Sequence, residues 1–289
     1  MKVLIEQLIY KALKDDVRII DCMATYDGQP AIFYREAPQD TDPGWYEGKC
    51  FPRADFNVCW SYDEEHKKVC KMVLNVWCLN ESGPYPEDIG NVFTKNMSDL
   101  ILAEEDGVYC TVWSSTESFE GTSVEPKTVG VTITFEILNF PDYRTFEPDP
   151  VVAVQSHIKR LIPDCLIIWN DEMQEHYKPE NERPVVYVRM SCEPTMTSAT
   201  YSVSWYKCTM TIHLMAPDFR ERQRWLQVLI RGLNSESGAL MTDQSFITYT
   251  KMSHNVSADP LCTGQITLTA SYGVLNDHPE HERLNHIHY

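Results

Sequence analysis

The chain has 289 residues, with 42 acidic against 25 basic side chains and a formal net charge of −17. Hydrophobic residues make up 43% of it and charged residues 23%, which excludes a disordered chain, a collagen-like chain and a coiled-coil rod. The excess negative charge argues against a nucleic-acid reader because it repels phosphate backbones, although a passage for DNA benefits from not binding it.

The apolar runs and the cysteines indicate the cellular compartment of the protein. Residues 1–16 lack the pattern of a signal peptide, and no apolar run approaches the roughly 20 residues that span a bilayer. None of the ten cysteines forms a Cys-x-x-Cys pair, and several stand in strand-like runs, where reduced cysteine behaves as a small apolar residue. We expect a soluble protein, made and kept in the cytosol.

The apolar pattern predicts two halves with the same elements in the same order. Each half begins with a helix and a short apolar run, and continues with a strand that starts at a proline and a second strand that pairs with it. A further helix and two closing strands complete each half. In the first half these elements are predicted at residues 3–16, 18–20, 52–60, 70–76, 86–102, 108–113 and 128–138. In the second half they are predicted at residues 151–161, 165–168, 184–190, 208–214, 218–233, 246–252 and 264–274.

The clearest match between the halves lies in the strands that begin at Cys70 and Cys208. Both read Cys-x-Met-x-(Leu/Ile)-x-(Val/Leu), with apolar residues at every second position. The two short apolar runs align Ile19 with Ile167, and the offset between them differs from the offset between the two cysteine-led strands. A longer loop over residues 37–53 of the first half accounts for this difference in offset.

We therefore expect an α+β fold of two tandem similar domains, each a mostly antiparallel or mixed β-sheet with helices packed on one side. The domains are predicted over residues 1–140 and 151–276. A proline-rich linker over residues 141–150 joins them, and a histidine-rich tail over residues 277–289 follows the second.

No sequence motif indicates a reaction. The phosphate loops GxxxxGK and GxGxxG are absent, as are GxSxG and HExxH, so we expect no enzyme and no cofactor. Four histidines in the tail have spacings that could ligate a metal, but a solvated or docked tail is the preferred interpretation, and no metal site is predicted. These histidines are His278, His281, His286 and His288.

Five residues are predicted at a subunit interface. Arg220 and Arg224 lie one turn apart on the same face of the second-half helix, which also carries Arg231, and a more acidic first half could meet this face. Trp77 and Trp205 stand on the polar side of their strands, and exposed aromatics with arginine are typical of interface cores. The alternatives are a solvated helix face for the arginines and a sheet covered on both faces for the tryptophans.

The order of elements resembles the tail terminator, or neck terminator, proteins of tailed bacteriophages. The closest local match runs through residues 168–190, including the proline-led strand Pro-Val-Val-Tyr-Val-Arg at 184–189, and Thr-Tyr-Asp-Gly at 25–28 is similar in the first half. The chain departs from the usual single-domain pattern by its doubling and by its tail.

The resemblance implies a virion protein, assembled in the cytoplasm of the host bacterium. It would form a six-fold or pseudo-six-fold ring, such as a hexamer, that caps the tail tube, ends tube polymerisation and joins the tail to the head–neck connector. Its partners would be copies of itself, the tail tube protein and the head–tail connector, with genomic DNA only as passing cargo and no membrane contact.

Two rival hypotheses remain open. The chain could be another tail tube or adaptor component, but a tube subunit needs long hairpins, and the loops look too short and proline-rich for them. It could also be a small-molecule-binding α+β protein or an enzyme, which would favour a monomer.

Overall fold

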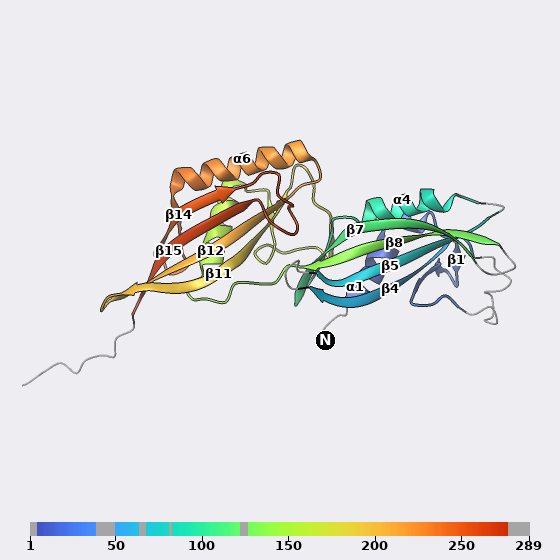
Figure 1. The fold of residues 1–289 in the computed structure, drawn as a ribbon, viewed down its shortest axis with the longest axis horizontal. Helices are drawn as coiled ribbons and strands as arrows, with labels where there is room; N and C mark the ends of the chain where they lie inside the picture. The colour runs from blue at the N-terminus through green and yellow to red at the C-terminus, as the bar shows by residue number, and fades with distance from the viewer. Residues whose placement is uncertain (1–4, 39–49, 64–67, 81–82, 122–126, 277–289) are drawn as a thin grey trace, which may run out of the picture. The chain divides into compact units, whose positions relative to one another are not determined.

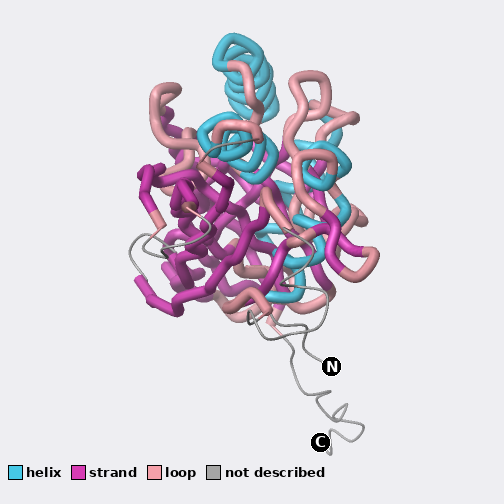
Figure 2. The backbone as a smooth tube through the Cα atoms, turned by 90° about the vertical axis from the view of Figure 1, so that its right-hand side faces the viewer, coloured by secondary structure: helices cyan, strands magenta, loops and turns pink. Residues whose placement is uncertain are grey.

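The computed structural model describes residues 5–38, 50–63, 68–80, 83–121 and 127–276. The fold is mixed α+β, with two curled β-sheets and few helices (Figures 1 and 2). The chain divides into two compact units. The first comprises Met1–Pro141 and Glu172–Pro179, and the second comprises Asp142–Asp171 and Glu180–Tyr289. No helix among the described residues is long and apolar enough to cross a membrane.

The first unit contains a two-stranded sheet and a larger sheet in the order β10-β6-β7-β8-β5-β4-β3. In the larger sheet only the pair β3–β4 is parallel. The helices are α1 (Ile5–Asp15), α2 (Val17–Ile20) and α4 (Pro86–Met97). The strands are β1 (Thr25–Tyr26), β2 (Gln29–Pro30), β3 (Ile32–Tyr34), β4 (Arg53–Asp63), β5 (Lys68–Leu79), β6 (Leu100–Glu104), β7 (Gly107–Glu120), β8 (Thr128–Asn139) and β10 (His176–Tyr177).

The core of the first unit follows from the periodicity of its sequence. Every second residue of β5 from Cys70 to Cys78 is buried, as the alternation of a strand requires. The apolar face of α1, including Ile9 and Leu13, belongs to the same hydrophobic cluster, together with Phe93 of α4. These helices therefore share one core with the sheet.

Strand β10 comes from a part of the chain far from the rest of the first unit. The chain leaves the second unit after Asp171, pairs antiparallel with β6, and returns to the second unit at Glu180. Ala103 N donates to Glu175 O at 2.9 Å, beside the pairing of His176 with Leu102. The sequence does not indicate this excursion, because it interrupts a stretch expected to belong to one continuous domain.

The second unit contains a sheet in the order β13-β14-β15-β12-β11-β9, in which only the pair β11–β9 is parallel. Its helices are α5 (Pro150–Leu161) and α6 (Phe219–Glu236). Its strands are β9 (Leu166–Ile167), β11 (Val185–Ala199), β12 (Val203–Met215), β13 (Gly238–Leu240), β14 (Phe246–His254) and β15 (Ile266–Leu275).

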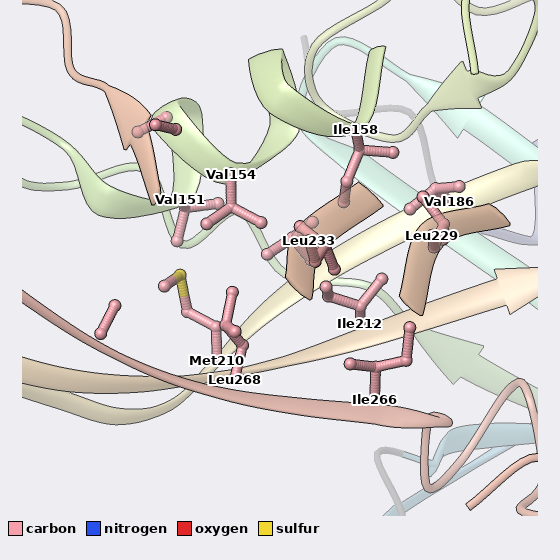
Figure 3. Close-up of a cluster of buried hydrophobic side chains, with 14 of the residues drawn as sticks. Val151, Val154, Ile158, Val186, Met210, Ile212, Leu229, Leu233, Ile266 and Leu268 are labelled. Carbon is pink, nitrogen blue, oxygen red and sulfur yellow. The ribbon is translucent and has the colours of Figure 1, made fainter. Parts of the chain in front are cut away.

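Both helices of the second unit contribute to one hydrophobic cluster with the strands. Figure 3 shows Val154 and Ile158 of α5 and Leu233 of α6 turned towards Ile212 and Leu268 of the sheet. Each of these five side chains is almost fully buried. At roughly 1.5–3 kcal/mol for a fully buried aliphatic side chain, this cluster is the main source of stability in the unit.

Several predicted elements need correction. The run at 18–20 is part of helix α2, because the Asp16 side chain accepts the Arg18 N–H and caps a helical turn, so its match to β9 is wrong. The helix predicted at 86–102 ends at Met97, since Asp99 takes a left-handed φ of 57° and the chain turns into β6. Three consecutive strands follow α4 (β6, β7 and β8) and three follow α6 (β13, β14 and β15), where the sequence predicts two in each half.

Candidate interaction surfaces

Helix α6 presents a face of basic side chains. Its N-terminus is capped by Asp218, and its buried leucines recur every three to four positions, which fixes the side that turns to the core. The predicted residues Arg220, Arg224 and Arg231 recur with the same period on the other side, and all three are exposed. These three residues, here called the arginine face, are thus brought together as the sequence predicts.

The charges of the arginine face are only partly compensated. Arg224 Nη1 lies 3.2 Å from Glu221 Oε2, an exposed pair that contributes little to stability. No salt bridge to Arg220 or Arg231 is formed by the residues that the structure describes. Arg222 differs from its neighbours, since its Nη1 donates to Ala216 O at 3.1 Å. The arginine face can therefore pair with an acidic surface.

The hairpin of β11 and β12 extends past the core of the second unit. Both strands are long, with 15 and 13 residues, and nearly all side chains from Ser191 to Tyr201 are exposed. The sequence pattern ends this strand at residue 190, because the residues that follow are mostly polar at consecutive positions. The strand β11 in fact continues to Ala199, so the expectation of short loops is wrong for this hairpin.

Trp205 stands near the turn of this hairpin, paired with Ser198 of β11 and opposite Gly273 of β15. Its side chain is 43% exposed, and Leu275, paired with Val203 on the same strands, is 75% exposed. A Cβ atom at Gly273 would lie 3.3 Å from the Trp205 ring, so the glycine lets the indole lie close to the strand. Trp205 therefore belongs to an exposed apolar patch. Its interface role stays a prediction.

Trp77 lies in a different setting, inside a network of the first unit. Its Nε1 donates to Asp55 Oδ2 at 2.5 Å, and Asn75 Nδ2 donates to the other carboxylate oxygen at 2.8 Å. Its ring packs edge-on against Phe119, with centroids 4.6 Å apart. Trp77 is half-buried, and its indole N–H is satisfied within the first unit. Its interface role stays a prediction.

A buried histidine was missed by the sequence reasoning. His157 Nδ1 lies 2.8 Å from the Tyr249 hydroxyl, and its Nε2 lies 3.3 Å from Glu236 Oε2. Burial lowers the pKa of His157, while Glu236 opposes this shift. Because the His157 side chain has no exposed surface, a substrate could reach it only if the unit opened. We interpret the three residues as a structural link between α5, α6 and β14.

The cysteines and the acidic residues give no sign of metal or redox chemistry among the described residues. No disulfide joins any of the ten cysteines, all of which lie in the described ranges, and burial raises the pKa of Cys78 and Cys165 to about 11 and that of Cys70 to about 12. No group of three His, Cys, Asp or Glu side chains in the described ranges could hold a metal ion. The tail histidines from His278 to His288 lie outside these ranges.

No protein-family model matches the chain, and no curated protein matches its sequence.

Proposed function

We propose that the chain is a structural protein of a tailed phage, which forms a ring at the end of the tail tube. The ring ends tube polymerisation and joins the tail to the head–neck connector, and genomic DNA passes through its centre. It acts by surface complementarity, with no chemical step, no cofactor and no membrane contact.

The observation that carries the proposal is the order of the strands. Without β10, the first sheet reads β6-β7-β8-β5-β4-β3 and the second reads β13-β14-β15-β12-β11-β9, and each has its one parallel pair at the same edge. This correspondence supports two tandem similar domains with helices on one side of each sheet. A chain that carries one unit twice presents equivalent surfaces at two places, and head-to-tail contacts between such surfaces close into rings when the rotation permits.

The distribution of charge supports the same proposal. A chain with a net charge of −17 concentrates three arginines on one exposed helix face, where an acidic surface of a neighbouring copy can pair with them. The remaining acidic surface suits a channel wall, because it does not trap the phosphate backbone of passing DNA. Six copies would give two stacked layers, and three copies would give a pseudo-six-fold ring.

A second candidate is a tail tube or adaptor subunit, and the hairpin of β11 and β12 favours it. From Ser191 to Ala199 nearly every side chain of β11 is exposed, and its outer edge has no partner among the described strands beyond the short pairing with β9, which suits it to pairing with a strand of a neighbouring subunit. Tube subunits of this kind would add copies without limit, whereas a terminating ring has a fixed number.

The test is to measure the mass of the purified protein in solution and then to image it by negative stain. The proposal expects one closed assembly of three or six copies with a central hole, independent of concentration above the dissociation range. Filaments of variable length would favour the tube subunit. A monomer at all concentrations would contradict both and would favour the small-molecule-binding protein or enzyme.

A further inference from the structure

The arginine face of α6 is one continuous stripe along the helix. Arg220 and Arg224 are four residues apart, and Val228, which is 37% exposed, stands between Arg224 and Arg231 at the same spacing. Residues three or four positions apart lie next to one another on a helix. All basic residues of α6 are arginines, and arginine is enriched at protein interfaces whereas lysine is depleted there. The stripe therefore has the composition of a contact surface.

Helix α4 of the first unit holds the same place in the order of elements as α6. It follows β5 and precedes β6, just as α6 follows β12 and precedes β13. Its exposed first turn carries the opposite charge, with Glu87 and Asp88, and Tyr85 beside this turn is 74% exposed. The one basic residue of α4 is Lys95, which stands in the last turn, about two turns away from Asp88.

A third acidic residue, Glu120, comes from the strand beside α4, which lies over β7 and β8 (Figure 1). Ser118 Oγ of β7 donates to Glu87 Oε1 at 3.2 Å and joins the strand to the first turn of the helix. Glu120 stands two residues further along β7, so it is on the same side of the sheet, and it is exposed. Glu87, Asp88 and Glu120 are here called the acidic face. None of them forms a salt bridge with a residue that the structure describes.

We infer that the arginine face of one copy binds the acidic face of a second copy of this chain. This inference rests on the proposed self-association and names the two surfaces that make it. The occupant is another copy because the chain itself carries the complementary charges, three against three, on the corresponding helix. Each face also has an exposed apolar neighbour, Val228 on α6 and Tyr85 before α4, so the contact combines ion pairs with apolar burial.

Opposite charges on corresponding helices also disfavour the wrong contacts. In a chain with two similarly ordered units, a contact between two first units would bring two acidic faces together, and a contact between two second units would bring two arginine faces together. Like charges oppose both of these contacts, whereas a first unit and a second unit attract each other. Each copy has one face of each kind, so the contact is heterologous and closes into a ring when the rotation permits.

The first test reverses the acidic face. Glu87→Arg with Asp88→Arg is expected to give monomers at moderate salt that retain the far-UV circular dichroism of the wild type, because both faces are then basic. Glu105→Arg with Asp106→Arg is the matched control, since both residues are exposed in the turn between β6 and β7 and the change in net charge is identical. Light scattering should find the wild-type mass for this control.

A milder variant covers the case in which arginines in the first turn of α4 prevent folding, since cations are unfavourable at a helix N-terminus. Glu87→Gln with Asp88→Asn removes the attraction without adding positive charge. It should raise the concentration at which the assembly dissociates by about tenfold, because two charge pairs are lost.

The second test restores the opposite charges. Arg220→Glu with Arg224→Glu makes both faces acidic, so this variant alone should be monomeric. When it is mixed in equal amounts with the Glu87→Arg, Asp88→Arg variant, each face meets its opposite on the other protein. The inference expects assemblies that contain the two variants one to one. All four substitutions in one chain exchange the charges and should restore the wild-type mass.

The outcomes separate the inference from the proposed function. A wild-type monomer contradicts the proposed ring and this inference together. A wild-type ring whose mass is unchanged by the variants of the acidic face overturns the inference alone, as does a loss of assembly in the control as well, which would assign the effect to net charge. Rescue by the fourfold variant but not by the mixture would place the pairing within one chain, and rescue by neither would show that the two faces are not partners. Both results also overturn the inference.

Discussion

At the scale of single residues, two glycines leave room for aromatic rings against the sheets, Gly130 for Phe119 and Gly273 for Trp205. Gly130 of β8 stands between Trp77 of β5 and Phe119 of β7, whose rings meet over it. A Cβ atom at Gly130 would lie 2.3 Å from Val76 O, a backbone atom that cannot move alone. We expect Gly130→Ala to destabilise the first unit by roughly 1–3 kcal/mol, the usual cost of overpacking.

Gly273→Ala is the matched control for this prediction. Its Cβ would lie 2.8 Å from a methyl group of Val203, a side chain at an exposed strand end that can rotate away. Chemical denaturation of both variants should show the larger loss for Gly130→Ala. Equal losses would mean that the backbone clash with Val76 O does not decide the effect.

His157 predicts a dependence of stability on pH. Burial lowers its pKa in the folded protein, whereas the unfolded chain has the ordinary value near 6.5. As the pH falls below 6.5, the unfolded state takes up a proton that the folded state resists, so the free energy of unfolding decreases. Tyr249, Glu236 and Arg160 are the polar and charged groups around the ring, and Glu236 reduces the shift without reversing it.

His157→Gln tests this prediction, because glutamine keeps hydrogen-bonding groups but does not titrate. Chemical denaturation at pH 7.5 and pH 5.5 should show a smaller loss of stability for the variant than for the wild type. An identical loss in both proteins would assign the pH dependence to other groups.

At the scale of elements, long segments with strong periodicity could be predicted from the sequence. The buried positions of β5 and β12 follow the alternation that begins at Cys70 and Cys208, and these strands hold the same place in their sheets. The short strands β6 and β13 were missed because three to five residues carry too little periodicity to distinguish a strand from a helix end. Their pairing depends on partners that are distant in sequence.

The cap of helix α5 carries a prediction at this scale. Asp149 is buried, and its carboxylate accepts hydrogen bonds from Val151 N at 2.7 Å, Val152 N at 3.1 Å and Phe146 N at 3.0 Å. Asp149→Ala leaves these donors without a partner and should cost roughly 2 kcal/mol.

Asp218→Ala provides the comparison for Asp149→Ala. Asp218 caps α6 in the same way but is exposed, so water can replace its bonds and the loss should be smaller. Thermal unfolding of the two variants compares the caps directly. A larger loss at Asp218 would contradict the role assigned to burial.

At the scale of the whole molecule, some groups of residues could be predicted because their members are close in sequence. Others could not, because their members come together only in the folded chain. The arginine face could be predicted because helical spacing alone places Arg220, Arg224 and Arg231 together. The network around Asp55 could not be predicted, because it joins residues on three strands. The insertion of β10 into the first unit depends on backbone hydrogen bonds, which any residue except proline can form, so composition does not reveal it.

The arginine face carries the last prediction. If an acidic surface of a neighbouring copy pairs with it, Arg220→Glu with Arg224→Glu places like charges together, which costs several kcal/mol at a contact and should yield monomers at moderate salt. Lys207→Glu with Lys251→Glu is the matched control, since both lysines are exposed on the sheet of the same unit and the change in net charge is identical. Light scattering should find monomers for the arginine variant and the wild-type mass for the lysine variant. An unchanged mass for both would remove the arginine face from the contact, whereas monomers for both would show that net charge, not this face, controls association.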